Sequence, residues 1–169
     1  MHKIFLSAGG NLNNTPEKFE RLFVLLRERV GEVVSQSSYY QSEAWGFESE
    51  HLFVNIAVGL QTELSPFELL EATQSIEKEL GRTQKTTTAY QDRTMDIDII
   101  FYDDAVIKTE NLEIPHPKMH ERDFVLTPLN EICPEFVHPI FLKKVSQLKI
   151  KGTSKNPLRH AELVSASPS

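Results

Sequence analysis

Two stretches with helical periodicity, each following a strand-like segment, constrain the fold of this chain more than any other feature. Within residues 19–30, apolar residues recur every three or four positions, after Pro16 at the first helical position. A second such stretch begins at a capping box formed by Ser65 and Glu68 and ends at Gly81. A helix with one apolar stripe must bury that stripe, and a sheet is the partner that the neighbouring strand-like segments offer.

Four segments have the composition or the alternation of β-strands: residues 3–8, 32–41, 53–60 and 94–102. With the helices in place, the order is strand, helix, strand, strand, helix, strand. We therefore predict an α+β fold of the ferredoxin-like βαββαβ type, an antiparallel sheet with both helices on one face and with additional C-terminal loops and short helices. Residues 1–150 are predicted to form a single domain, and the polar, serine-rich residues 151–169 a disordered tail.

The charge and the cysteine content argue against several classes of protein. With 18 Lys and Arg against 24 Asp and Glu, the net charge is -6, which disfavours a general nucleic-acid binder. No apolar run approaches the roughly 18 residues of a membrane span. The single cysteine, Cys133, has no partner for an internal disulfide, which suits a reducing compartment. We expect a cytoplasmic monomer without nucleic-acid or membrane partners.

The strongest chemical signal is the pair Asp96 and Asp98 in the last predicted strand. Side chains alternate along a strand, so both carboxylates face the same way, about 6.6 Å apart. The same alternation predicts Tyr102 on the face of the aspartates and Phe101 on the other. Such a pair can bind a hard cation. It can also be the solvated face of an edge strand, and for an arbitrary pair of this spacing that alternative is at least as common.

Basic residues near the aspartates in the sequence favour a phosphate ligand: Arg82, Lys85, Arg93, His116, Lys118 and Arg122. Magnesium is usually held by one or two carboxylates together with substrate phosphates, while cationic side chains neutralise the remaining charge. The glycine-rich phosphate loops are absent, so side chains and metal would have to hold a nucleotide. His116 and His120 have the spacing of helical zinc ligands, but Pro117 favours an extended conformation at His116 and disfavours that site.

A second set of residues suits a flat, polar heterocycle. Phe53 and Asn55 share a strand face, and Trp45 and Phe124 supply further aromatic surface. Core packing is the alternative for the two phenylalanines. On the second helix, Gln74 and Glu77 share the polar face and lead towards Arg82, although a solvated helix face would look the same.

These residues resemble the 6-hydroxymethyl-7,8-dihydropterin pyrophosphokinases of folate biosynthesis, over about residues 3–148. The segments that carry the resemblance are 7–12 (SAGGNL), 53–55 (FVN), 77–82 (EKELGR), 93–99 (RTMDIDI), 114–117 (IPHP) and 122–126 (RDFVL). The sequence departs from the common bacterial pattern at Gln84, Asn111, Tyr90 and the pair Ser42-Glu43.

The resemblance implies transfer of pyrophosphate from ATP to the hydroxymethyl group of the pterin, with release of AMP. It implies two Mg²⁺ ions bound by Asp96 and Asp98, which would be catalytic together with Arg82 and Arg93. The implied ATP contacts are Gln74, Glu77, Arg82, Tyr90, Arg93, Ile99, His116 and Arg122. The implied pterin contacts are Gly9, Ser42, Trp45, Phe53, Asn55 and Phe124.

Two other functions remain as alternatives. One is a non-catalytic ferredoxin-like ligand-binding domain in which the aspartates are a surface pair. The other, RNA binding by the sheet, is disfavoured because the chain is acidic and lacks the paired aromatic residues of RNA-binding sheets.

Overall fold

The computed structural model describes residues 1–11, 15–43, 52–82, 95–148 and 157–158, and it is built around an antiparallel sheet. At its centre, β1 (His2–Asn11) pairs with β4 (Leu52–Thr62) on one side and β5 (Asp96–Tyr102) on the other. The other neighbours of β4 are β2 (Gly31–Gln36) and β3 (Tyr39–Glu43). The strand order is β5-β1-β4-β3-β8, where β8 is Pro157–Leu158, and β2 lies beside β4.

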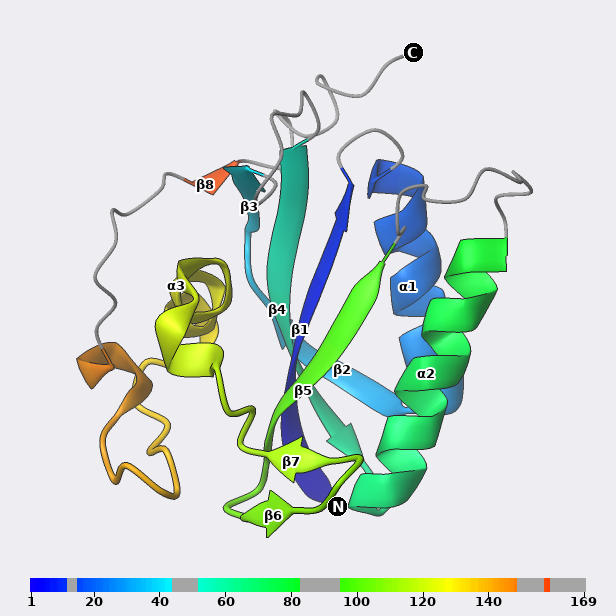
Figure 1. Ribbon diagram of the computed structural model, residues 1–169. Coiled ribbons are helices and arrows are strands. Elements are labelled where there is room, and N and C mark those ends of the chain that lie inside the picture. Colours follow the sequence, from blue (N-terminus) through cyan, green and yellow to red (C-terminus); the bar gives the residue numbers. More distant parts are fainter. Residues whose placement is uncertain (12–14, 44–51, 83–94, 149–156, 159–169) are drawn as a thin grey trace.

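Helices cover both faces of this sheet (Figure 1). α1 (Thr15–Arg29) and α2 (Pro66–Arg82) lie on one face, and α3 (Asp123–Ile132) lies on the other. The chain between β5 and α3 contains a two-stranded ribbon, β6 (Ile107–Lys108) and β7 (Glu113–Ile114), and the 3₁₀ turn η2 (Met119–Glu121). A second 3₁₀ turn, η3 (Val145–Gln147), follows α3. The predicted class, helices packed on an antiparallel sheet, is confirmed.

Local sequence signals explain where α2 begins. The Glu68 backbone N–H donates to the Ser65 hydroxyl at 3.2 Å, and the Ser65 N–H donates to a Glu68 carboxylate oxygen at 2.9 Å. This is the predicted capping box, which satisfies two backbone donors that the first turn leaves without partners. On the outer surface, Arg21 and Arg29 of α1 both pair with Glu79 of α2 and join the two helices.

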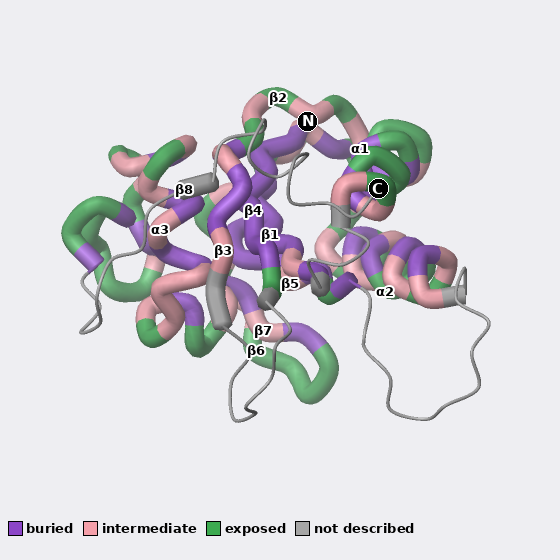
Figure 2. The backbone as a smooth tube through the Cα atoms, turned by 90° about the horizontal axis from the view of Figure 1, so that it is seen from above, coloured by how far each residue is buried: buried purple, intermediate pink, exposed green. Residues whose placement is uncertain are grey.

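Two apolar cores lie on the two faces of the sheet, and buried residues concentrate along the strands between them (Figure 2). The larger core contains the alternate residues Ile4, Leu6 and Ala8 of β1 and the apolar stripes of α1 and α2. The smaller core contains Phe5 of β1 and the buried side of α3. Odd-numbered residues from Phe5 to Gly9 therefore face α3, and even-numbered ones face α1 and α2.

The predicted strand over residues 32–41 is two strands, β2 and β3, separated at Ser37 and Ser38. The Ser37 hydroxyl accepts the Ala57 N–H at 2.9 Å, a bond that a regular ladder would give to a main-chain carbonyl. The Ser38 N–H and hydroxyl both donate to the carboxylate of Glu131 on α3, at 2.9 and 3.0 Å. Side chains thus replace ladder hydrogen bonds at this bend, which composition alone does not reveal.

The predicted alternation along β5 fails after Ile99. In the register, Leu6 opposes Ile99 and Phe5 opposes Phe101, so Ile100 is an extra residue in a β-bulge. Phe101 consequently lies in the core under α3, and Tyr102 in the core under α1 and α2, the reverse of the prediction. Asp96 and Asp98 precede the bulge, and they oppose Gly9 and Ser7 on the α3 face as the alternation requires.

The segment predicted as a tail contributes one short strand, β8 (Pro157–Leu158), which pairs with Tyr39 and Tyr40 of β3. Within the described ranges of the chain, no helix has the length and the apolar character that crossing a membrane requires.

His138 is a buried histidine that organises the loop after α3. Its Nδ1 accepts the backbone N–H groups of Ile140 and Phe141, both at 3.1 Å, and its ring stacks on Phe141 at 4.2 Å between centroids. Burial, with a smaller contribution from the nearby His120, lowers the pKa of His138 from 6.5 to about 4. The folded protein therefore favours the neutral form of the His138 ring.

We expect His138 to make the protein less stable as the pH falls from 6.5 towards 4. The unfolded chain takes up the proton below its ordinary pKa and the native state does not, so stability is complete above 6.5 and is lost on acidification. Between pH 7 and 4.5 the loss should be about 2 kcal/mol in urea-unfolding experiments. In His138→Asn, the amide oxygen can accept the same N–H groups but does not titrate. This variant should lose that much less stability over the same range, and equal losses in both proteins would contradict the assignment.

Candidate active site

One row of residues crosses four strands on the α3 face of the sheet. The pairing registers place Tyr40 of β3 opposite Asn55 of β4, Asn55 opposite Gly9 of β1, and Gly9 opposite Asp96 of β5. Phe53, two residues before Asn55, faces the same way. The sheet therefore gathers Gly9, Phe53, Asn55 and Asp96, four residues that the sequence nominated from three separate segments.

The two carboxylates lie at the β5 edge of this row. Asp96 is exposed, and the side chain of Asp98 is 39% exposed. Among the described residues, no group of three or more His, Cys, Asp or Glu side chains could hold a metal ion. Two carboxylates that reach solvent fit a magnesium ion that takes its remaining oxygens from water and a phosphorylated substrate.

His116 is fixed beside Asp98. Its backbone N–H donates to the Ile100 carbonyl at 3.2 Å, which attaches this segment to β5. The ring Nδ1 accepts the Lys118 N–H at 3.1 Å, so Nε2 carries the proton of the neutral ring and lies 4.0 Å from the nearest Asp98 carboxylate oxygen. Burial lowers the pKa of His116, and the Asp98 charge opposes this effect. Its segment lies outside any helix, so the helical face that a zinc pair with His120 would need is absent there.

Glu77 connects α2 to the strand that carries the aspartates. Its carboxylate accepts the Ile97 N–H at 2.7 Å, a donor on the edge of β5 that faces away from β1. Gln74, one turn earlier, is exposed on the same helix. Arg82 is the last residue of α2, and its side chain lies outside the described part of the chain.

Arg122 and Phe124 lie at the start of α3, above the sheet face. Phe124 is half-buried and packs on the smaller core, and the Arg122 guanidinium carbon is 5.7 Å from the centre of its ring. Their position brings a cation and an aromatic surface to the face that holds Asn55 and Asp96. The helix is held in place by its buried residues Val125, Leu126 and Leu129.

Not every nominated residue joins this arrangement. The Ile99 side chain is buried in the core under α1 and α2, so only its main chain is available on the β5 edge. Trp45, Tyr90 and Arg93 lie outside the described residues, as does the side chain of Ser42. Tyr40, which completes the row, was not nominated from the sequence, although it lies in the same strand as the nominated Ser42, two residues earlier.

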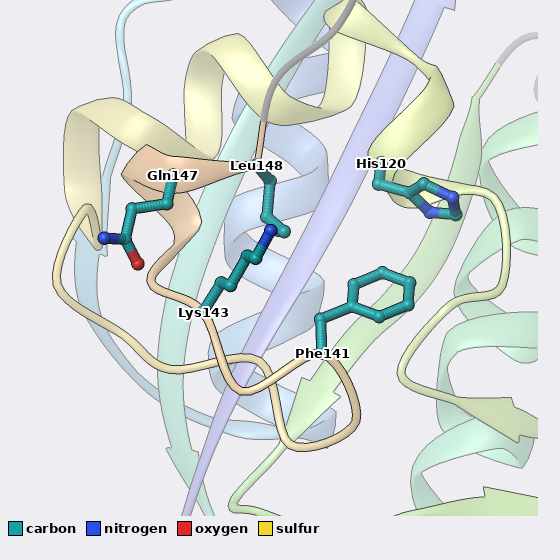
Figure 3. A pocket seen from close by; sticks show the side chains of 5 residues that line it. All are labelled: His120, Phe141, Lys143, Gln147 and Leu148. Atoms are coloured by element: carbon teal, nitrogen blue, oxygen red, sulfur yellow. The ribbon is translucent and has the colours of Figure 1, made fainter.

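A cavity of about 670 Å³ lies elsewhere, beside η2, η3 and the loop between α3 and η3. Figure 3 shows His120 and Phe141 on one side of it and Gln147 on the other, with Lys143 and Leu148 between them. It contains none of the residues nominated for ATP, pterin or magnesium, and Lys143 is its only lysine, arginine or carboxylate. The cavity is therefore not the candidate site.

The fold and the site together indicate a class of enzyme. Paired carboxylates at a sheet edge, with a histidine, an arginine and a buried amide on the same face, are typical of enzymes that bind a metal–phosphate substrate beside a second, polar substrate.

Comparisons with known proteins identify the family. The family model described as 7,8-dihydro-6-hydroxymethylpterin-pyrophosphokinase matches residues 5–134. A 2-amino-4-hydroxy-6-hydroxymethyldihydropteridine pyrophosphokinase from Porphyromonas gingivalis is 43% identical over 80% of this chain and 93% of that protein. The enzyme of the same name from Aquifex aeolicus is 37% identical over 92% of this chain and 95% of that protein. The chain belongs to the 7,8-dihydro-6-hydroxymethylpterin-pyrophosphokinase family.

A solved structure supports the fold at much lower sequence identity. The crystal structure of Plasmodium falciparum HPPK-DHPS with SDX-DHP matches 88% of this chain with a TM-score of 0.69 and 17% identity. This chain covers 43% of that longer chain.

Proposed function

We propose that this protein transfers pyrophosphate from ATP to the hydroxymethyl group of 6-hydroxymethyl-7,8-dihydropterin and releases AMP, as a step of folate biosynthesis. The observation that carries the proposal is the row from Asn55 through Gly9 to Asp96, which puts an amide suited to a heterocycle beside a carboxylate suited to a metal. Family membership supports the same reaction. The alternative of a non-catalytic domain is not favoured.

Asp96 and Asp98 would hold two Mg²⁺ ions together with the triphosphate oxygens. When bound, the ions offset negative charge on the transferred group and on the AMP that leaves. The aspartates act by position and charge, with Arg82 and Arg93 as further catalytic groups, and the reaction needs no protein nucleophile. The exposure of both carboxylates supports this role, because a metal and its substrate must reach them from solvent.

The remaining ATP contacts are assigned to the β5 edge and its surroundings: Gln74, Glu77, Tyr90, Ile99, His116 and Arg122. His116 supports this assignment because its Nε2 lies 4.0 Å from an Asp98 carboxylate oxygen, where its proton can be donated to a phosphate oxygen of a bound substrate. Glu77 also has a structural role. Its bond to the N–H of Ile97, the residue between the two aspartates, attaches β5 to α2 at this point.

The pterin contacts are assigned to the row and its borders: Gly9, Ser42, Trp45, Phe53, Asn55 and Phe124. An amide offers both a donor and an acceptor to the polar edge of a pterin, and Phe124 offers a ring for stacking. Asn55 is only 5% exposed, so the sheet fixes its orientation before the substrate binds.

Gly9→Ala is expected to weaken pterin binding by about tenfold. This is the usual effect of losing one hydrogen bond, here the bond between the Asn55 amide and the pterin. A Cβ at this position would lie 2.3 Å from the Asn55 side-chain oxygen, so the amide would have to move. Fluorescence titration of the pterin measures the effect. Asn55→Ala should weaken binding to a similar extent, and the double variant should be little worse than either. Additive losses would show that Gly9 acts independently of Asn55.

The same proposal extends to the fold type, the location and the oligomeric state. Antiparallel neighbours in the order β5-β1-β4-β3, with α1 and α2 on one face, support a ferredoxin-like βαββαβ arrangement. The buried free thiol of Cys133, whose pKa burial raises to about 12, suits a reducing cytoplasm. A monomer is proposed because β1, β4 and β5 of one chain already bring Gly9, Asn55 and Asp96 side by side.

The nucleotide product tests the function. Incubation with Mg-ATP and the pterin should give AMP, and omission of the pterin should give none. ADP would indicate transfer of a single phosphoryl group, and binding of the pterin without any product would favour the non-catalytic alternative.

A further inference from the structure

A carboxylate on α3 connects this helix to the bend between β2 and β3. Glu131 accepts hydrogen bonds from the Ser38 N–H at 2.9 Å, the Ser38 hydroxyl at 3.0 Å and the Tyr40 hydroxyl at 2.7 Å. These three donors lie more than ninety residues before Glu131 in the sequence. We call this set of contacts the Glu131 latch.

Tyr40 connects the latch to the candidate site. It is buried, and it stands directly opposite Asn55 in the β3–β4 register, at the end of the row that continues through Gly9 to Asp96. Side chains of directly opposed residues on one sheet face lie about 5 Å apart at Cβ. A shift of Tyr40 would therefore displace the Asn55 amide. This amide occupies the position above Gly9 that a Cβ there would need.

The other end of α3 carries the second wall of the same site. Phe124 lies in the first turn of the helix and Glu131 in the last, about 10 Å apart along its axis. Asn55 belongs to the sheet and Phe124 to the helix. The latch is a polar attachment of that helix to the strand next to Asn55, and it adds to the apolar packing of Val125, Leu126 and Leu129 on the sheet.

We propose that Glu131 and Tyr40 are positioning residues for the pterin pocket, which hold the Phe124 wall on α3 at its working distance from the Asn55 wall on the sheet. The inference rests on the proposed pterin contacts of Asn55 and Phe124. Neither Glu131 nor Tyr40 needs to touch the substrate, and neither contributes to the carboxylate pair on β5.

The protonation states suit this role. Burial and the bond to Glu131 raise the pKa of the Tyr40 hydroxyl, so it stays a donor. The Tyr40 and Ser38 bonds lower the pKa of Glu131 against an opposing effect of burial, so it stays an acceptor. The latch is thus complete at neutral pH.

The test compares pterin and ATP binding in Tyr40→Phe and Glu131→Gln. Each variant removes or weakens the hydrogen bond from the Tyr40 hydroxyl to the Glu131 carboxylate and preserves side-chain size. Both should raise the pterin Kd about five- to tenfold, measured by pterin fluorescence with a non-hydrolysable ATP analogue and magnesium present. The Kd of the ATP analogue should change less than twofold. The double variant should resemble the single ones, because both act on one contact.

Tyr39→Phe is the matched control. Tyr39 neighbours Tyr40 but faces the other core, where its ring packs edge-on against Phe19 at 5.2 Å. Loss of its hydroxyl should leave the pterin Kd unchanged even if the melting temperature falls. A folded Tyr40→Phe protein with the wild-type pterin Kd, or equal weakening of pterin and ATP analogue, would overturn the proposal.

Two further variants separate this result from a failure of the proposed function. Asn55→Ala and Phe124→Ala should both weaken pterin binding if the pterin site is correctly assigned. If they do and the latch variants do not, the latch proposal alone is wrong. If none of the four variants changes pterin binding, the assigned pterin site is wrong and the latch proposal falls with it.

Discussion

Asp96→Ala and Asp98→Ala are each expected to lower kcat about a thousandfold or more and to leave the fold intact. In the proposed function these carboxylates hold the metal that offsets charge on the transferring phosphates, and several kcal/mol of transition-state stabilisation would depend on that charge. Neither side chain belongs to an apolar core, and both reach solvent. Their removal therefore costs activity far more than stability.

Steady-state turnover measures the loss, and Mn²⁺ titration followed by electron paramagnetic resonance measures the metal site directly. With a non-hydrolysable ATP analogue present, the wild-type protein should bind two Mn²⁺ ions and each variant fewer. Asp104→Ala is the matched control, because Asp104 is exposed in the turn just after the same strand. Near-normal turnover in a double Asp96→Ala, Asp98→Ala protein would refute the metal assignment.

Phe101→Ala is expected to destabilise the protein by about 3–5 kcal/mol, the usual cost of truncating a large buried aromatic side chain. Phe101 is 0% exposed. Its ring contacts Phe136 at 4.4 Å between centroids and lies edge-on to Phe5 and His138, at 6.3 and 5.7 Å. The surrounding rings come from β1 and from the loop between α3 and η3, so they cannot all close around the space left by the ring.

Urea unfolding of Phe101→Ala measures this effect. Phe67→Ala provides the control, because Phe67 is 49% exposed in the first turn of α2 and should lose well under 1 kcal/mol. Similar losses in the two variants would mean that Phe101 does not have the central place in the smaller core that its contacts indicate.

Local signals in the sequence were sufficient for the first two helices, α1 and α2, and for the carboxylate pair. The capping box at Ser65 and the stripe that ends near Gly81 predicted α2, and the structure has that helix over Pro66–Arg82. The period-two alternation predicted that Asp96 and Asp98 share a face, which the register with Gly9 and Ser7 confirms.

Structural features that depend on residues far away in the sequence could not be predicted from local sequence patterns. The bulge at Ile100 exchanges the faces of Phe101 and Tyr102, and only the pairing with β1 reveals it. The bend at Ser37 and Ser38 depends on Ala57 and Glu131, which lie in other elements.

The C-terminal helix illustrates the same limit. Pro128 signals a loop by itself, yet it lies inside α3, where it removes one helical hydrogen bond. The burial of Val125, Leu126 and Leu129 against the sheet offsets that loss. Tertiary packing thus overrides a local breaker at the element that positions Arg122 and Phe124.

The most direct test of pyrophosphoryl transfer follows the β-phosphorus of ATP. With ATP labelled at the β-phosphate, Mg²⁺ and 6-hydroxymethyl-7,8-dihydropterin, the label should appear in the pterin product, with one equivalent of unlabelled AMP. Label that remains entirely in ADP, with transfer of the γ-phosphate alone, would contradict the assigned reaction even if the pterin binds as expected.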